Sequence, residues 1–203
     1  MNMQRLPVFL MAACLLWSAS EATAQTWRSL RTVPESRCSQ YRASDYSYPQ
    51  SIEARIVESL GGIWSPYTDR TFASTRQTDI EHIVARSEAH DSGLCAATAE
   101  TRRRFATDLL NLTLASPGVN RSQKGALDAA EWLPDRNQCW FVDRVVRVRQ
   151  KYSLTIDRRE ADALDRVLAS CASTLLVRGD SRVAERIDPG GRSWQKTAGM
   201  RSE

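Results

Sequence analysis

Hydrophobic residues recur with a helical period in several stretches of the chain. A spacing near 3.6 residues predicts helices over residues 49–60, 98–110 and 137–152, and a last helix that opens at Asp157 with an apolar stripe to Leu175. A further helix is expected over 120–132, before Pro134. Gly61-Gly62 is typical of a helix end, Thr98 of an N-cap, and Asp157 with Glu160 has the spacing of a capping box.

Two short segments alternate with period two instead, which is the pattern of a strand. Residues 78–84 read T-D-I-E-H-I-V and place Ile80 and His82 on one face, and residues 110–115 read L-N-L-T-L-A. Residues 63–77 are expected to be loop or short strand, and the polar residues 85–96 to be a loop. The fold class that follows is α+β, mostly helical around one strand pair.

The composition is that of a globular protein of about one domain. Hydrophobic residues make up 42% of the 203 residues and charged residues 26%, which excludes wholesale disorder, coiled coil and collagen. The 28 Lys and Arg against 24 Asp and Glu give a net charge of +4, an excess too small to identify a nucleic-acid-binding protein. Arg102-Arg103-Arg104 is expected to be a solvated helix face, and Trp132, Trp140 and Phe141 to be core.

One long apolar run lies at the N-terminus. Arg5 precedes the apolar residues 6–17, and Ala22-Thr23-Ala24 ends the polar stretch that follows, which is the pattern of a secretory signal peptide. The run is too short to cross a bilayer, and its continuation past Cys14 favours ordinary cleavage over lipid attachment there. We therefore expect a signal peptide at 1–24, a folded domain at 25–178, a disordered tail at 179–203, and a secreted or periplasmic protein with no membrane attachment after cleavage.

Four cysteines remain after cleavage, and an even number in an exported chain indicates two disulfides with three alternative pairings. We favour Cys38 with Cys95 and Cys139 with Cys171, because the second pair would staple two neighbouring predicted helices. No C-x-x-C spacing is present, which argues against a zinc cluster.

A separate group of polar residues points to chemistry. Glu81 and His82 lie near the end of the first predicted strand, Asn111 lies in the second, and Asn120 opens the next expected helix nine residues later. Hydrolysis of a phosphodiester bond needs a base that deprotonates water and a cation that neutralises charge on the phosphate. Histidine, with an ordinary pKa of about 6.5, is suited to be that base. Oxygen ligands from a carboxylate and an amide suit Mg²⁺ or Mn²⁺ better than zinc.

This order of strand, strand and helix resembles the ββα-metal fold of HNH nucleases. The matching pieces are D-I-E-H-I at 79–83, N-L-T-L at 111–114 and N-R-S-Q-K at 120–124. They are similar to the branch that includes the HNH domain of RNA-guided DNA nucleases and the nuclease domain of some modification-dependent restriction enzymes. Two departures stand out, since Asn120 takes the place of a third His in many members and Ala85 that of a common Pro.

The resemblance implies a role for each matching residue. His82 would be the general base and Asn111 a brace for the loop that carries it. Glu81 and Asn120 would be the metal ligands, Lys124 and Arg121 phosphate contacts, and Asp79 a group supporting the metal site. A lone strand histidine is usually structural, and the ordered set of neighbours is what favours a function for His82. For His90 two interpretations stay open, a place in the substrate groove or a cap for its loop.

The sequence therefore predicts a secreted, metal-dependent endonuclease of DNA, with RNA also open as a substrate. The resemblance implies 5′-phosphate and 3′-hydroxyl ends, and little sequence preference is expected because nothing else in the chain resembles a reader of bases. Two alternatives stay open: an inactive, disulfide-stapled binding module, and a toxin whose partner is an immunity protein. Formal glycosylation sequons begin at Asn111 and Asn120 within the proposed site, which favours a bacterial host. No pattern indicates the oligomeric state.

Overall fold

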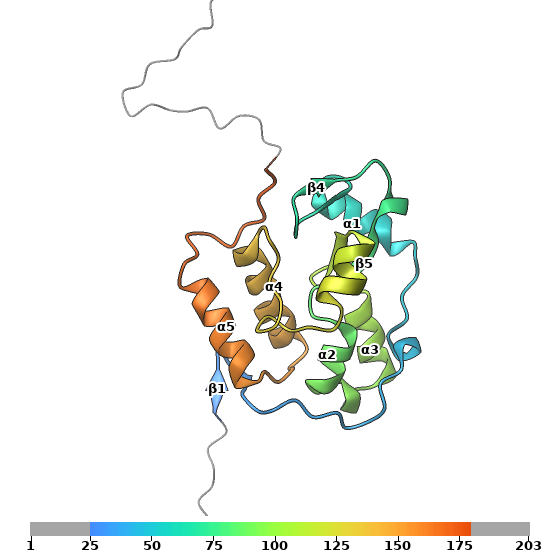
Figure 1. The fold of residues 1–203 in the computed structure, drawn as a ribbon. Helices are drawn as coiled ribbons and strands as arrows, with labels where there is room; N and C mark the ends of the chain where they lie inside the picture. Colours follow the sequence, from blue (N-terminus) through green and yellow to red (C-terminus); the bar gives the residue numbers. More distant parts are fainter. Residues whose placement is uncertain (1–24, 180–203) are drawn as a thin grey trace, which may run out of the picture.

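The computed structural model describes residues 25–179 and has an α+β fold, as the sequence predicts (Figure 1). The signal peptide expected at 1–24 and the expected tail from residue 180 onward lie outside the described residues. The α-helices are α1 (Ile52–Leu60), α2 (Arg86–Asp91), α3 (Ala99–Ala106), α4 (Gln138–Lys151) and α5 (Arg158–Leu168). The strands are β1 (Thr26–Trp27), β2 (Leu30–Arg31), β3 (Trp64–Ser65), β4 (Arg70–Thr71), β5 (Asp79–His82) and β6 (Leu112–Ala115). Short 3-10 helices are η1 (Ala43–Tyr46), η2 (Thr75–Gln77) and η3 (Leu94–Ala96), and η4 (Gly118–Lys124) is a π-helix.

The strands form three antiparallel pairs, β1 with β2, β3 with β4 and β5 with β6. In the third pair Asp79 lies opposite Ala115 and His82 opposite Leu112, and every residue of β6 is buried. Helix α1 covers this pair, because Ile52 and Ile56 pack with Ile80 in one hydrophobic cluster that also holds Leu112 and Leu114. The two segments that alternate in the sequence are therefore the strand pair around which this half of the molecule is built.

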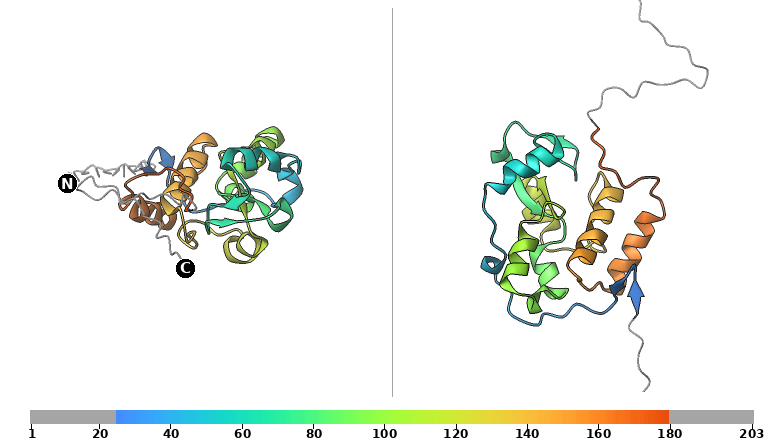
Figure 2. Two further views of the ribbon diagram at one scale, coloured as in Figure 1. Left: turned by 90° about the horizontal axis from the view of Figure 1, so that it is seen from above. Right: turned by 180° about the vertical axis from the view of Figure 1, so that it is seen from behind.

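The second half is a helical hairpin. Helices α4 and α5 lie side by side, away from α1, α2 and α3, and the N-terminal segment before α1 runs along the base of the molecule between the two groups (Figures 1 and 2). The larger hydrophobic core joins both halves and contains Phe105 of α3, Phe141 and Val145 of α4, and Leu164 of α5. Trp140 and Phe141 are buried and Trp132 packs against the same core, as expected.

Three expectations about helices are wrong. Residues 85–96 are not a loop, since they form α2 and η3, and Glu88 and His90 are buried there because partners from distant segments satisfy their polar groups. The helix expected over 120–132 is the seven-residue η4, which ends at Gly125 with a φ of 50°. Asp128 then accepts the backbone N–H groups of Ala130 and Glu131, which holds the chain in a turn.

The last helix is also shorter than its apolar stripe. Helix α5 begins as expected, because the Asp157 side chain accepts a hydrogen bond from the Glu160 N–H at 2.9 Å, but it ends at Leu168 instead of near Leu175. The Ser170 hydroxyl donates to the Val167 carbonyl at 2.8 Å, a local bond that competes with the helix. Cys171 lies just beyond this end, where it is free to reach α4.

Both favoured disulfides are present. Cys38 is bonded to Cys95 with a Cα–Cα distance of 5.6 Å, and Cys139 to Cys171 with a Cα–Cα distance of 5.7 Å. The first ties the N-terminal segment to η3, and the second closes the α4–α5 hairpin at the end opposite its connecting loop.

Removal of the hairpin disulfide is expected to destabilise the protein. The double variant Cys139→Ala/Cys171→Ala should lower the free energy of unfolding by about 2–4 kcal/mol, because the unfolded chain regains the freedom that the cross-link removes. Urea unfolding of the oxidised parent and of the variant measures the difference. Non-reducing peptide mapping that finds free thiols at both positions of the parent would contradict the pairing itself.

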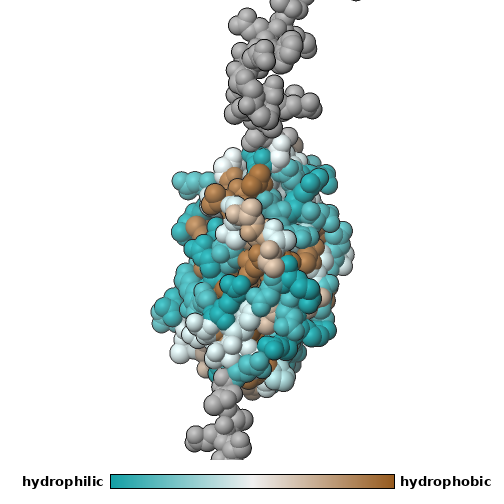
Figure 3. All heavy atoms as spheres, turned by 90° about the vertical axis from the view of Figure 1, so that its left-hand side faces the viewer, coloured by the Kyte–Doolittle hydropathy of each residue, from teal (hydrophilic) through white to brown (hydrophobic). Residues whose placement is uncertain are grey.

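Within residues 25–179 no helix has both the length and the apolar character needed to span a membrane. The side of the molecule on which α5 lies is mostly hydrophilic, and its hydrophobic areas do not form one continuous patch (Figure 3). Leu175 and Val177, in the segment after α5, are the most exposed of the large hydrophobic residues in the part of the chain that the structure describes.

Candidate active site

The β5–β6 pair positions the residues that the sequence singles out. Glu81 lies opposite Thr113 and His82 opposite Leu112, and the pairing continues past β5 because the Ile83 N–H donates to the Asn111 carbonyl at 2.8 Å. Asn111 itself is fully buried, and its side chain bonds both backbone groups of Val84, accepting from the N–H at 2.8 Å and donating to the carbonyl at 3.1 Å. Asn111 therefore holds the segment that directly follows His82.

His82 is held in one orientation and one tautomer. Its Nε2 lies 3.0 Å from the carbonyl oxygen of Ala106. A carbonyl only accepts, so Nε2 carries the proton in a neutral ring and Nδ1 is left as the basic nitrogen. Among the described residues Nδ1 has no hydrogen-bond partner, and the ring is stacked on Phe105 and faces Tyr48. Burial, with the nearby charge of Arg86, lowers the pKa of His82 to about 3, so the ring is neutral at ordinary pH.

Glu81 is half of a buried ion pair. Its Oε1 lies 2.8 Å from Nζ of Lys124, and both side chains are almost fully buried. Lys124 also donates to the His82 carbonyl at 3.0 Å, so it joins η4 to the end of β5. Burial raises the pKa of Glu81, and the charge of Lys124 opposes that shift. Lys124 thus points into the protein, whereas the sequence interpretation places its ammonium group on substrate phosphate.

Asn120 and Arg121 both bind Asp79. The Asn120 Nδ2 donates to Asp79 Oδ2 at 3.0 Å, which leaves the amide oxygen of Asn120 pointing away from that carboxylate. The Arg121 guanidinium makes a two-pronged contact with the same carboxylate, with bonds of 2.7 and 2.6 Å. Asp79 therefore orients Asn120, and it engages two of the five N–H donors of Arg121, the residue that the sequence interpretation assigns to phosphate.

Glu81, His82 and Asn120 meet at one small cavity of 150 Å³. Glu81 and His82 are neighbours on a strand, where side chains normally point to opposite faces. They share a cavity because they lie at the end of β5, where η4 closes over the end of the strand. The other lining residues come from the N-terminal segment, β5, α2 and the turn after η4, and are Tyr41, Tyr48, Ile80, Ala85, Arg86, Ser87, Gly125 and Ala126.

The structure does not bring His90 to this cavity. It is fully buried, its Nδ1 lies 2.9 Å from the Tyr46 hydroxyl, and its Nε2 donates to the Ser39 carbonyl at 2.8 Å. Both ring nitrogens are thus used to join α2 to the N-terminal segment. Of the two interpretations left open for His90, this position favours the structural one.

Arg86 is a cavity residue that the sequence interpretation missed. It begins α2 four residues after His82, in the stretch expected to be a loop. Its Nη1 donates to the Tyr46 carbonyl at 3.3 Å, and its guanidinium carbon lies 5.4 Å from the centre of the Tyr48 ring. The signal in the sequence is the spacing of four residues between His82 and Arg86, together with the helix that begins at Arg86. That helix is recognised only from the distant partners of its buried polar residues.

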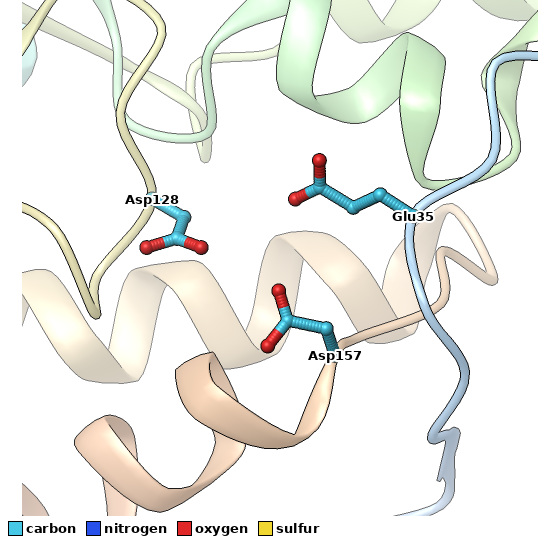
Figure 4. Close-up of side chains that lie close together, drawn as sticks. All are labelled: Glu35, Asp128 and Asp157. Carbon is cyan, nitrogen blue, oxygen red and sulfur yellow. The ribbon is translucent and has the colours of Figure 1, made fainter.

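A second group of acidic side chains lines a neighbouring cavity, which shares Ser87 and Ala126 with the first. Oxygen atoms of Glu35, Asp128 and Asp157 lie within 4.8 Å of one another beside a larger cavity of 680 Å³ (Figure 4). Burial and the adjacent Glu88 raise the pKa of Glu35 to about 8. The other two carboxylates already have structural partners, because Asp128 holds the turn after η4 and Asp157 caps α5.

The comparison with known families agrees with the motif. The family described as "GmrSD restriction endonucleases, C-terminal domain" matches residues 23–167, which include every residue of the candidate site. The chain belongs to this family. The predicted relationship to nucleases is thereby confirmed at the level of a nuclease-related family.

One relative of this family member is a protein of Arthroderma benhamiae described as an "Uncharacterized secreted protein". The two are 29% identical over 123 residues, which cover 59% of this chain and 60% of the relative. A secreted relative and two disulfides are consistent with an extracellular location, as expected. No solved structure matches the chain.

Proposed function

We propose that this protein is a secreted endonuclease that depends on a divalent cation and hydrolyses phosphodiester bonds of DNA, with RNA as a further substrate to test. The observation that carries the proposal is the bond from His82 Nε2 to the Ala106 carbonyl. That bond makes Nδ1 the proton acceptor in a cavity that Glu81 and Asn120 also line. Membership of a nuclease-related family supports the same reaction class.

The residues present fit a divalent cation such as Mg²⁺ or Mn²⁺. Glu81 offers a carboxylate and Asn120 an amide oxygen, and hard oxygen donors of this kind are the ligands that Mg²⁺ prefers. The bond from Asn120 Nδ2 to Asp79 leaves the Asn120 oxygen free of other partners among the described residues. A cation held by Glu81 and Asn120 would neutralise the negative charge that develops on the phosphate in the transition state.

The reaction would then run through His82. A water molecule attacks phosphorus while its proton passes to Nδ1 of His82, and a new P–O bond forms. The bond from phosphorus to the 3′ oxygen breaks, and that oxygen takes a proton from solvent, which leaves a 5′-phosphate and a 3′-hydroxyl. Asn111 keeps the segment after His82 in place, and the Ala106 carbonyl keeps the ring in the basic tautomer.

Plasmid cleavage with a titration of Mg²⁺ tests the proposal. The parent should nick plasmid, EDTA should stop it, and Asn120→Ala should lower the maximal rate by about 100-fold or more, since the metal contributes several kcal/mol to the transition state. Glu35→Gln is the matched control, because it removes a carboxylate from the acidic group in Figure 4 and leaves the candidate site intact.

Each outcome of this titration decides something. Loss of rate in Asn120→Ala with a normal Mg²⁺ response in Glu35→Gln supports the assigned metal site. The reverse pattern would move the metal to the acidic group. Absence of cleavage by the parent with Mg²⁺ and with Mn²⁺ would overturn the enzyme assignment and favour a binding module that keeps the fold without activity.

A further inference from the structure

Neither Lys124 nor Arg121 presents its charge to the cavity of the candidate site. Lys124 is buried and paired with Glu81, and Arg121 does not line the cavity and uses two of its N–H donors on Asp79. A nucleophile that attacks a phosphodiester anion generates further negative charge on the non-bridging oxygens. A positive group facing the cavity is therefore required besides any metal ion.

Arg86 meets this requirement. It lines the cavity with Glu81 and His82, and it has no acidic partner among the described residues. Its guanidinium carries five N–H donors, and the Tyr46 carbonyl takes one of them. The remaining donors are available to an anion, and the planar fork of a guanidinium matches two oxygens of a phosphate.

The environment of Arg86 holds it in position without neutralising it. The Tyr46 carbonyl and the face of the Tyr48 ring are polarised or π-rich groups that bind a cation but carry no net charge. The guanidinium is partly buried, so its field at the cavity is weakly screened compared with that of an exposed arginine. A cation that is oriented, partly desolvated and held in no salt bridge at a cavity is typical of an anion-binding site.

We propose that Arg86 binds the non-bridging oxygens of the phosphate that is cleaved and is thus a further catalytic residue of this site. The inference rests on the proposed nuclease function and gives its substrate contact. Arg86 neutralises charge as the phosphorus gains a fifth oxygen, while His82 takes the proton of the attacking water. The role differs from that of Lys124 and Arg121, which position Glu81 and Asp79.

Cleavage kinetics of Arg86→Gln at saturating DNA test the catalytic contact. The maximal rate should fall by about 100- to 1000-fold, the range for loss of one preorganised donor to a developing anion. Arg86→Lys should fall less, because it keeps the charge and loses the fork. Arg166→Gln, on the exposed surface of α5, is the matched control and should cleave as the parent does.

Binding of a short DNA duplex in EDTA at several salt concentrations gives a second reading that needs no cleavage. Loss of one phosphate contact should reduce the slope of log K against log salt by about 1 in Arg86→Gln and leave it unchanged in Arg166→Gln. A change in stability alone would not move this slope.

The two readings separate failure of the inference from failure of the proposed function. An unchanged slope in Arg86→Gln overturns the phosphate contact, whether or not the parent cleaves DNA. A reduced slope with an unchanged maximal rate also overturns the proposal, because Arg86 would then bind a phosphate other than the one cleaved. A reduced slope in Arg86→Gln, together with a parent that never cleaves DNA, would keep the phosphate contact and reject the nuclease.

Discussion

Replacement of His82 by alanine is expected to lower the rate of DNA cleavage by about 10²- to 10⁴-fold, the usual contribution of a general base. The Ala106 carbonyl fixes the ring, and no other histidine lines the cavity to accept the proton in its place. The chain has one other histidine, His90, and it is buried elsewhere. Plasmid nicking by purified protein, with melting curves to confirm the fold, measures the effect.

Imidazole added to His82→Ala offers a stricter test of the same role. Truncation of the ring leaves a space beside Phe105 and Tyr48, and free imidazole that enters it should restore part of the rate. A structural histidine would give no such rescue. Full activity in His82→Ala would show that another group is the base and would remove the foundation of the proposed mechanism.

His90→Gln is the matched variant for the second histidine. It loses bonds to Tyr46 and Ser39, so a lower melting temperature is expected, with a cost of about 1–3 kcal/mol for buried groups left unpaired. The folded fraction should cleave DNA at the parent rate, because His90 does not line the cavity. A selective loss of rate without loss of stability would return His90 to the substrate groove.

The strand pair and most helices could be predicted because their signals are local. The alternation over 78–84 and 110–115 becomes β5 and β6, and the apolar spacing around Ile52 and Ile56 becomes the face that α1 packs on them. The stretch at α2 carries no such signal, since Glu88 and His90 are polar and are buried by partners more than forty residues away. Burial of polar groups depends on the tertiary structure, and the local pattern does not show it.

The same limit applies to the site. The order of Glu81, His82 and Asn120 in the sequence was enough to place them near one another, and they line one cavity. Which cation pairs with which carboxylate was not predictable, because Lys124 and Arg121 are recruited by Glu81 and Asp79 across the fold. Arg86 could not be predicted from the sequence either, because a cation without an acidic partner is recognised only from its surroundings in the fold.

Replacement of Arg149 by methionine is expected to lower the free energy of unfolding by about 3–5 kcal/mol, the range for breaking a buried ion pair from one side. Arg149 of α4 is almost fully buried and binds Glu88 of α2 at 2.5 Å and Glu160 of α5. It also donates to the Ser92 hydroxyl at 2.9 Å. One side chain therefore joins the helical hairpin to the half of the molecule that carries the site.

Arg147→Met is the matched control on the same helix. Arg147 is exposed and contacts Asp143 at 3.5 Å, so its loss should cost less than about 1 kcal/mol. The triple variant Arg149→Met/Glu88→Gln/Glu160→Gln should recover most of the loss, because it leaves no buried charge without a partner. Equal effects of Arg147→Met and Arg149→Met would contradict the assigned importance of the buried network.

The pH dependence of these variants tests the same network independently. Burial raises the pKa of Glu160 from its ordinary 4.5 to about 7, even though the charge of Arg149 opposes the shift. A carboxyl whose folded pKa is raised contributes stability that is present below pH 4.5 and is lost as the pH rises toward 7, because the unfolded state releases its proton first. In Arg149→Met the positive charge that opposes this shift is gone, so the pKa of Glu160 rises further. The destabilisation measured by urea unfolding should therefore be largest near pH 8 and should shrink toward pH 5, whereas a pH-independent loss would indicate that Arg149 acts through packing alone.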